Sequence, residues 1–487
     1  MAHQNDIRFL LNGEEKSIAD VKATLTLLDY LRIEQRLIGT KEGCAEGDCG
    51  ACTVLVGRLH NGVLRYETVN ACIRFLASLN GCHIVTIEHL SGPDGRLHPV
   101  QQSMVDYHGS QCGFCTPGFV MSLYALWMEK PKPTAHEVET ALQGNLCRCT
   151  GYEPIVKAAL AVNEYGTPAN DHLNRERADI TKRLTALQPT GRVETGPEDD
   201  RAILPKDVAD LAQVLADNPK ATIVAGSTDV GLWVTKFMRP ISPVVFITHL
   251  QELKSIEITD EAVTIGAGVT YTESEEAIRA AFPHLSEYWD RIAGWQVRNM
   301  GTIGGNIANG SPIGDTPPVL IALGAEVTLA SATGERSLPL EEFFIDYGKQ
   351  DRESGDFVSS IRIPRAQEGQ IDAAYKISKR RDEDISSVAA GISVTVSEGI
   401  ITDARIALGG MAATPKRAAH AEAALRGQQW GNTCFDTAAE ALSQDFAPLT
   451  DWRATAEYRL LVAGNLLRRF YLEHDTNHDA PVRLAIA

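Results

Sequence analysis

Three cysteines lie within nine residues of this chain, and their spacing constrains the fold more than any other feature of the sequence. Cys44, Cys49 and Cys52 follow the pattern C-x4-C-x2-C, and Cys72 comes after nineteen further residues. This is the plant-type spacing for a [2Fe–2S] cluster, in which a loop wraps the cluster and one distant thiolate completes the ligand set. A four-cysteine zinc site or a set of disulfides is the alternative. Structural zinc favours separated C-x2-C-like pairs, however, and disulfide frameworks are typical of short secreted chains.

A second group of four cysteines lies at the ends of predicted helices. Cys112 and Cys115 form a C-x2-C pair, and Cys147 and Cys149 form a C-x-C pair. The helices are predicted to be antiparallel, so their ends can meet and bring four thiolates to one end of a small bundle. C-x-C alone is a weak signal. Paired with C-x2-C after a ferredoxin-like loop, it predicts a second [2Fe–2S] cluster, with a zinc site as the alternative.

Composition and charge limit the partners and the cellular compartment of the protein. The 487 residues carry a formal charge of −17, which disfavours nucleic acid and anionic membranes as partners. Eight of the ten cysteines fall in the two groups, and Cys82 and Cys434 are predicted to be structural thiols. We see no apolar run behind a basic start and no apolar stretch long enough to span a bilayer. We therefore expect a soluble protein in a reducing, cytoplasmic compartment.

The residues around the cysteine groups predict one β-rich and one helical domain. Asn12-Gly13 is a hairpin signal within residues 7–18, and residues 20–36 have the apolar spacing of a helix. Thr134 and Glu137 form a capping-box pattern that begins another helix. Further predicted elements are strands at 53–59 and 63–69 and helices at 98–107, 117–128 (capped by Thr116, with Pro117 first) and 154–162.

Two glycine-rich turns in the second half of the chain indicate a dinucleotide site. Residues 221–231 read as an apolar strand, a turn rich in small and hydroxyl side chains, and a helix, and residues 301–306 form a second such turn. Strand–turn–helix junctions of this kind hold pyrophosphate through backbone N–H groups. Neither turn matches G-x-G-x-x-G, so the Rossmann fingerprint is absent. Two such turns beside an iron–sulfur module favour an FAD site over plain tight turns.

The predicted fold class is α+β multidomain. Little periodicity is visible in residues 166–200 outside 180–187, so that stretch is predicted to be a linker. The predicted domains are a β-grasp ferredoxin-like domain at 1–90, a four-helix-type [2Fe–2S] domain at 91–165, a linker at 166–200 with one short helix at 180–187, an α/β FAD-binding domain at 201–370 and a C-terminal α/β flavoprotein domain at 371–487.

Three segments, residues 42–52, 111–118 and 144–151, resemble the iron–sulfur modules of the molybdenum hydroxylase family, and the glycine-rich turns resemble the FAD domain of the same enzymes. Two clusters followed by FAD in one chain is similar to the small subunits of bacterial xanthine dehydrogenases. The resemblance implies an electron relay during oxidation of hypoxanthine or xanthine to urate. Electrons would pass from molybdenum to the helical-domain cluster, then to the ferredoxin-like cluster, FAD and NAD+.

Two alternatives stay open. An equivalent subunit acting on an aldehyde or an N-heterocycle would look the same, because the substrate pocket would lie on the partner. A ferredoxin–flavin reductase that works without molybdenum is the other, although it would not need the second cluster.

The resemblance also implies cofactors, partners and site residues. This chain would hold two [2Fe–2S] clusters and FAD, with NAD+ as the acceptor. A large partner subunit would hold the molybdopterin cofactor, since the chain ends after the flavin unit, and two small and two large subunits would form a heterotetramer. No catalytic residue is assigned. The residues implied to ligate iron are Cys44, Cys49, Cys52, Cys72, Cys112, Cys115, Cys147 and Cys149, and those implied to contact FAD are Ile223, Val224, Ala225, Gly226, Ser227, Thr228, Asp229, Val230, Ile292, Thr302, Ile303, Gly304, Gly305, Asn306, Asp315, Val358 and Lys376.

Overall fold

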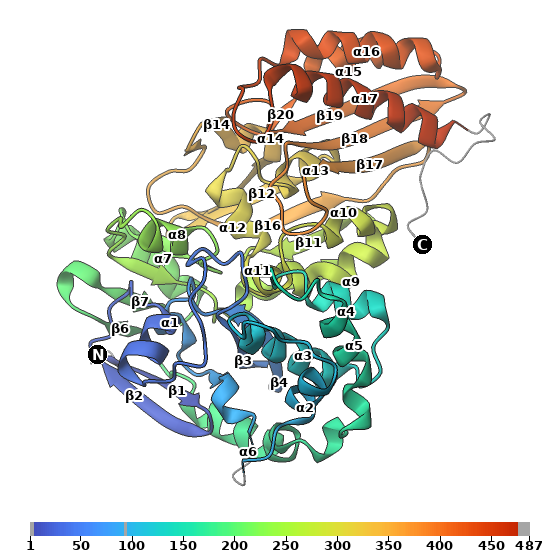
Figure 1. The fold of residues 1–487 in the computed structure, drawn as a ribbon. Helices are drawn as coiled ribbons and strands as arrows, with labels where there is room; N and C mark the ends of the chain where they lie inside the picture. The colour runs from blue at the N-terminus through green and yellow to red at the C-terminus, as the bar shows by residue number, and fades with distance from the viewer. Residues whose placement is uncertain (1–3, 92–94, 476–487) are drawn as a thin grey trace. The chain divides into compact units, whose positions relative to one another are not determined.

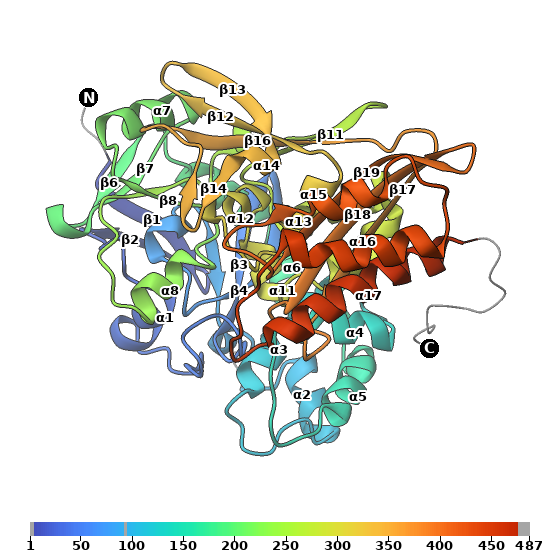
Figure 2. The same ribbon diagram turned by 90° about the horizontal axis from the view of Figure 1, so that it is seen from above.

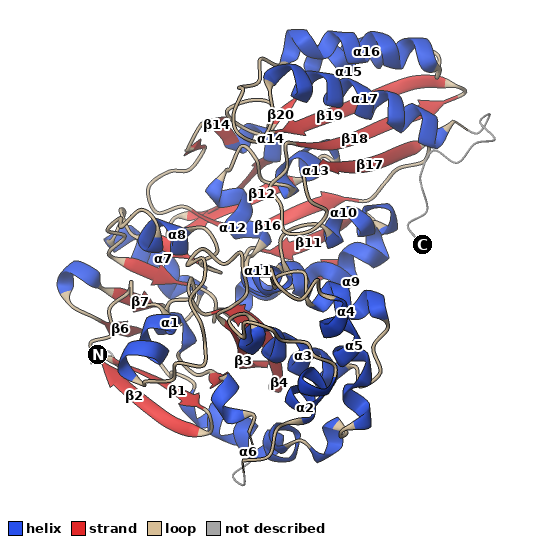
Figure 3. Ribbon diagram, viewed as in Figure 1, coloured by secondary structure: helices blue, strands red, loops and turns tan. Residues whose placement is uncertain are grey.

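Helices and strands are both abundant in the computed structural model, which describes residues 4–91 and 95–475 (Figure 1). Figure 3 shows them in several separate sheets and helical groups, so the α+β multidomain class is confirmed. The contacts divide the chain into two units. The N-terminal unit comprises the residues up to Leu250 together with Thr270–Thr272 and Ala293–Gly301, and the C-terminal unit comprises Gln251–Val269, Glu273–Ile292 and the residues from Thr302 on.

The first sheet of the N-terminal unit grows from the predicted hairpin. Asn12 and Gly13 have φ of 51° and 86°, the left-handed conformation that a tight hairpin turn requires. The sheet has the order β2-β1-β5-β3-β4, with β5 parallel to β1 and antiparallel to β3. This arrangement confirms the β-grasp prediction. The strands are β1 Asp6–Leu11, β2 Glu14–Ala19, β3 Thr53–His60, β4 Val63–Asn70 and β5 His83–Val85.

The helix predicted at 20–36 is shorter than expected. Thr26 caps α1 (Leu27–Asp29) by accepting from Asp29 N, and a π-helical turn at Tyr30–Glu34 follows. The preceding residues do not join the helix because their polar groups are used elsewhere. Ala23 N donates to Asp200 O at 3.0 Å, and Thr24 Oγ1 donates to Asp200 Oδ2 at 2.5 Å.

Four helices form the second domain, as predicted. They are α2 Pro99–Asp106, α3 Thr116–Glu129, α4 Ala135–Ala141 and α5 Glu153–Ala161. The capping box of α4 is confirmed, since Thr134 N donates to Glu137 Oε2 at 2.8 Å and Glu137 N donates to Thr134 Oγ1 at 3.3 Å. Helix α3 begins one residue earlier than expected, with Cys115 rather than Thr116 at its N-cap.

The predicted linker contains a long helix instead of a short one. Helix α6 spans His172–Leu187, and its buried residues Leu173, Ile180, Leu184 and Leu187 belong to the hydrophobic core shared with the helical domain. Asp171 caps α6 and also accepts from Tyr124 Oη at 2.8 Å and contacts His98 Nε2 at 3.1 Å. Burial would raise the pKa of Asp171, but the hydrogen bonds from His98 and Tyr124 hold it below its usual value. This stretch is therefore an integral part of the N-terminal unit.

A four-stranded sheet of order β6-β7-β9-β8 completes this unit. β9 pairs in parallel with both β7 and β8. The predicted strand–turn–helix at 221–231 is confirmed as β8, a turn and α8. The elements are β6 Val193–Thr195, β7 Ala202–Leu204, α7 Val208–Asp217, β8 Thr222–Val224, α8 Val230–Thr235, β9 Val244–Phe246 and α11 Trp295–Met300.

The C-terminal unit contains two larger sheets, of order β10-β11-β16-β12-β13 and β17-β18-β19-β20. Helices α15, α16 and α17 cover one face of the second sheet and share its core (Figures 1 and 2). Across the described residues, no helix is both long enough and apolar enough to cross a bilayer. The strands are β10 Ile256–Ile258, β11 Ala262–Gly266, β12 Glu326–Ser331, β13 Gly334–Pro339, β14 Phe344–Asp346, β15 Lys349–Gln350, β16 Phe357–Pro364, β17 Gln370–Ile377, β18 Val388–Ser397, β19 Ile400–Gly409 and β20 Lys416–Arg417. The helices are α9 Tyr271–Ala281, α10 Ser286–Asp290, α12 Ile303–Asn309, α13 Thr316–Ala322, α14 Leu340–Phe343, α15 Ala419–Leu425, α16 Asn432–Asp445 and α17 Ala456–His474.

Candidate functional site

The first four cysteines form one cluster of thiols, called here the first quartet. The Cys44 thiol hydrogen-bonds those of Cys49 and Cys72, and Cys72 also pairs with Cys52. These thiol hydrogen bonds hold the pKa of Cys44 well below its usual range and raise that of Cys72. The lowered pKa of Cys44 favours its thiolate, the form that ligates metal.

Backbone N–H groups surround the Cys44 sulfur. The N–H groups of Glu46, Asp48 and Cys49 lie 3.5, 3.4 and 3.4 Å from its Sγ. The loop can turn its amides inward because Gly47 has φ of 82° and its carbonyl accepts from Asn70 Nδ2 at 2.7 Å. Inward-facing amides stabilise negative charge, so this loop suits an anionic sulfur cluster.

The second quartet lies at the ends of helices in the helical domain. The Cys149 Sγ lies 3.8 Å from those of Cys112 and Cys147, and the Cys115 thiol hydrogen-bonds that of Cys147. Burial would raise the pKa of Cys147, but hydrogen bonds from Thr150 lower it to about 7. Burial and the Cys147 thiol raise the pKa of Cys115 to about 12.

Each quartet is a connected group of four sulfurs. In the first, Cys44 contacts Cys49 and Cys72, and Cys72 contacts Cys52. In the second, Cys149 contacts Cys112 and Cys147, and Cys147 contacts Cys115. A [2Fe–2S] cluster has four cysteine ligands spread over two irons, and four neighbouring sulfurs in each quartet fit this requirement.

The two quartets are adjacent inside the N-terminal unit. Leu146 N donates to Cys49 O at 3.0 Å, one residue before a ligand of the second quartet. The backbones touch so closely that a Cβ added to Gly50 would lie 2.1 Å from Gly144 O, and one added to Gly118 would lie 2.1 Å from Gly50 O. Glycine is required at these positions by the contact between the two cysteine-bearing domains.

Helix α8, which follows the first glycine-rich turn, also contacts the first cysteine loop. Lys236 Nζ, just beyond the helix, donates to Cys44 O and lies 3.5 Å from Glu46 Oε2. Thr235 Oγ1 donates to Ala45 O at 2.7 Å. Gly231 packs against Ile73, where a Cβ would lie 2.8 Å from the Ile73 Cβ. The helix that follows the predicted FAD-binding turn therefore touches the residues around two ligands of the first quartet.

The first glycine-rich turn connects β8 to α8 as predicted. A Cβ on Gly226 would lie 1.8 Å from Met300 O, so the turn packs tightly on the end of α11. Ser227 has φ of 60°, a conformation that non-glycine residues seldom adopt. Its Oγ donates to Gly226 O at 2.6 Å. The turn is thus sharply bent and held in place by its neighbours.

The remaining predicted FAD contacts lie in the C-terminal unit. The second glycine-rich turn joins helix α11 to α12, and Thr302 Oγ1 accepts from Gly305 N at 2.9 Å. Asp315 and Lys376 pair with each other at 2.5 Å, and Ser386 Oγ donates to the other carboxylate oxygen of Asp315 at 2.5 Å. Ile292 and Val358 are buried, with exposed fractions of 4% and 5%.

Sequence reasoning missed several polar residues that join the sites. Lys236, Asn145 and Gln296 hydrogen-bond across domains, and only Asn145, inside the second cysteine motif, has a local signal in the sequence.

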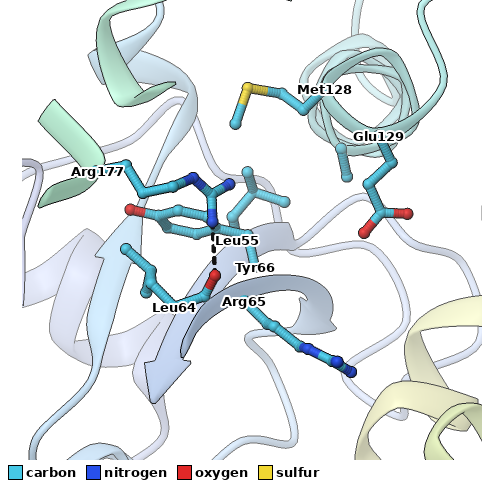
Figure 4. Close-up of a pocket in the computed structure, with 8 residues that line it drawn as sticks. Leu55, Leu64, Arg65, Tyr66, Met128, Glu129 and Arg177 are labelled. Carbon is cyan, nitrogen blue, oxygen red and sulfur yellow. Dashed lines mark hydrogen bonds between the residues drawn. The ribbon is translucent and has the colours of Figure 1, made fainter. Parts of the chain in front are cut away.

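A pocket of about 220 Å³ between β3, β4, α3 and α6 is also not predicted by the sequence. There Arg177 reaches over Tyr66 and donates to Leu64 O at 2.5 Å (Figure 4). None of the residues that line it belongs to either quartet or to the glycine-rich turns.

Family models agree with this arrangement. The 2Fe-2S iron-sulfur cluster binding domain matches residues 9–75, and the [2Fe-2S] binding domain matches residues 86–160. The FAD binding domain in molybdopterin dehydrogenase matches residues 198–366, and the CO dehydrogenase flavoprotein C-terminal domain matches residues 373–474. Two quartets of neighbouring sulfurs and these matches define the class of protein as an iron–sulfur flavoprotein oxidoreductase component.

Similar proteins give a narrower assignment. Xanthine dehydrogenase/oxidase of Gallus gallus is 32% identical over 96% of this chain and 40% of its own length, and aldehyde oxidase 2 of Macaca fascicularis is 30% identical over 97% and 39%. The carbon monoxide dehydrogenase structure from Hydrogenophaga pseudoflava is 30% identical, with a TM-score of 0.52, over 55% of this chain and 93% of that one. The chain belongs to the molybdenum hydroxylase family. It spans about two fifths of the length of the curated relatives it matches.

Proposed function

We propose that this chain is the iron–sulfur/FAD electron-transfer component of a xanthine dehydrogenase. It takes electrons from a molybdopterin cofactor on a large partner subunit during oxidation of hypoxanthine and xanthine to urate, and delivers them to NAD+. Support comes from two [2Fe–2S] domain matches and an FAD-binding domain match in one chain, and from the xanthine dehydrogenases among its relatives.

The observation that carries this proposal is the order of contacts in the N-terminal unit. The first quartet lies between the second quartet, through Cys49 and Leu146, and helix α8, through Cys44 and Lys236. When bound, the iron–sulfur clusters would carry single electrons, and FAD would exchange single electrons with them and a hydride with a nicotinamide. The chain's own residues supply ligation, spacing and local charge.

Exposure of the thiols supports the direction of the relay. Cys112 and Cys149 of the second quartet are exposed, whereas Cys52 and Cys72 of the first are buried. The ring of Phe114, beside the second quartet, is 48% exposed. We therefore propose that electrons arrive at the second quartet, on a surface that the large partner subunit covers. We also propose that two small and two large subunits assemble into one complex.

A second candidate is the equivalent component of an enzyme that oxidises an aldehyde or an N-heterocycle. Aldehyde oxidase 2 is nearly as similar as the xanthine dehydrogenases, and the quinoline 2-oxidoreductase structure from Pseudomonas putida is 27% identical with a TM-score of 0.51. The residues of this chain do not separate the two candidates, so the substrate must be tested directly.

The test is to purify the chain with whatever co-elutes and to measure iron, zinc, molybdenum and flavin. We expect about four irons per FAD, because each [2Fe–2S] cluster holds two, and NADH formation on addition of xanthine. Light scattering of the complex gives the stoichiometry. NADH formation with an aldehyde but not with xanthine supports the second candidate. Zinc in place of iron contradicts both.

A further inference from the structure

A group of buried polar side chains lies where the two cysteine-bearing domains meet. It is called here the polar junction and consists of Thr53, Ser122, Asn145 and Gln296. Its centre is Gln296 of α11, which is fully buried. The two hydrogens of its Nε2 are shared among Thr53 Oγ1 at 3.0 Å, Asn145 Oδ1 at 2.9 Å and Ser122 Oγ at 3.3 Å. One side chain thus contacts three segments that are far apart in sequence.

Asn145 links the polar junction to both cysteine motifs. Its Oδ1 accepts from Ser122 Oγ at 2.7 Å and from Gln296, and its Nδ2 lies 3.3 Å from Gly50 O. Gly50 lies between two ligands of the first quartet, and Asn145 lies two residues before Cys147 of the second. The side chain of Asn145 therefore spans the contact through which Leu146 N bonds Cys49 O.

The local backbone is shaped to admit Gln296. A Cβ on Gly144 would lie only 1.7 Å from Gln296 Oε1, so any side chain at position 144 would push the amide out of its present place. Buried hydrogen bonds of this kind are strong, and leaving one partner unsatisfied is costly, because water cannot replace it. The polar junction therefore favours one arrangement of the two ligand loops over nearby alternatives.

We propose that Gln296 and Asn145 are positioning residues that fix the separation of the two clusters and so set the electronic coupling between them. The inference rests on the proposed function only in requiring that both quartets hold [2Fe–2S] clusters. Electron tunnelling and the magnetic interaction between two reduced clusters both weaken steeply with separation. A small shift of one ligand loop against the other would change both.

The test uses Gln296→Met and Asn145→Leu, which keep the side-chain size and remove the hydrogen bonds, in the full chain with its co-eluting partners. The readout is the spin–spin splitting in the EPR spectrum of the fully reduced protein, with iron content measured in parallel. We expect full iron, a smaller splitting in each variant and non-additive effects in the double variant, because the two residues are in contact. Ser122→Ala, which removes only one hydroxyl, should give a weaker change of the same kind.

Asn299→Leu is the matched control. Asn299 lies on the same helix and is 2% exposed, but its Nδ2 donates to Thr68 O at 2.9 Å and Thr68 Oγ1 at 3.1 Å on β4, and not to the loops that carry Gly50 and Asn145. It should destabilise the protein without changing the splitting. Equal changes in Asn299→Leu and Gln296→Met, or unchanged splitting in Ser122→Ala and both junction variants with full iron, would overturn the proposal. A wild-type chain without iron would instead contradict the proposed function.

Discussion

The backbone N–H of Leu146 donates to the carbonyl oxygen of Cys49 at 3.0 Å. Cys49 belongs to the first quartet, and Leu146 directly precedes Cys147 of the second. One hydrogen bond and a few covalent bonds therefore separate the two ligand sets. This short connection makes the quartets, and the residues that hold them together, the parts of the molecule most informative to change.

Replacing one ligand of the second quartet should remove one cluster and leave the other. For Cys149→Ser we expect about half of the iron to be lost, with flavin retained, because each quartet holds its own pair of irons. Metal analysis of the purified variant measures this. Cys82→Ser is the control, since Cys82 is a buried thiol outside both quartets. Full iron in Cys149→Ser, or comparable loss in the control, contradicts the assignment of ligands.

Removing a positive or a negative charge beside Cys44 should shift the midpoint potential of the first cluster in opposite directions. Lys236→Met removes a cation that contacts Cys44 O, and Glu46→Gln removes the anion 3.5 Å from that cation. Both side chains are partly exposed, so solvent screens them, and each charge is worth about 20–40 mV. An EPR-monitored redox titration should show a lower potential for Lys236→Met and a higher one for Glu46→Gln. Lys157→Met, on the helical domain, should leave this potential unchanged.

The close approach of the two cysteine-bearing domains should make Gly50 intolerant of a side chain. A Cβ there would lie 2.1 Å from Gly144 O at a φ of +67°, so Gly50→Ala should lower the free energy of unfolding by about 2–4 kcal/mol. Gly62 has a similar φ of +79° with open space around it, and Gly62→Ala should cost only about 1 kcal/mol. Thermal unfolding of the two variants separates the clash from the conformational strain. Equal costs would mean that the two backbones are not in contact.

Acid should destabilise the fold partly through His83. Burial, with a smaller effect from neighbouring cations, lowers the pKa of His83 to about 3, against about 6.5 in the unfolded chain. Between these values the unfolded chain binds a proton that the folded chain does not, so stability falls as the pH falls from about 6.5 towards 3, by about 1.4 kcal/mol per pH unit. His83→Gln should flatten this dependence in denaturant titrations at several pH values. Replacement of the exposed His136 by Gln should not.

Local signals explain what the sequence predicts well. The Asn12-Gly13 turn and the Thr134 capping box each depend on a few neighbouring residues, and both are found where expected. Helix α6 is longer than the predicted helix at 180–187, because its apolar residues Leu173, Ile180, Leu184 and Leu187 are separated by many charged ones that hide the pattern. Their spacing is nevertheless helical, and a search for one apolar stripe would have found it.

Long-range polar contacts could not be predicted in the same way. Gln296 contacts Asn145 across 151 residues of sequence, and an amide side chain in a short helix gives no indication of its partner. The sequence likewise gives no indication that Asp315 pairs with Lys376, 61 residues away. Such pairs depend on how whole domains pack, which is set by the summed burial of many side chains and not by any local pattern.

The position of Gln296 limits how freely these domains can be exchanged between proteins. Family boundaries suggest that the two iron–sulfur domains are portable modules, yet the amide at the centre of the polar junction comes from the flavin-binding portion of the chain. A chimera that transplants only the cysteine-bearing domains would bring them to a host whose matching helix lacks this fit. Recombination in this family should therefore keep residues 293–301 and both cysteine loops from the same parent protein.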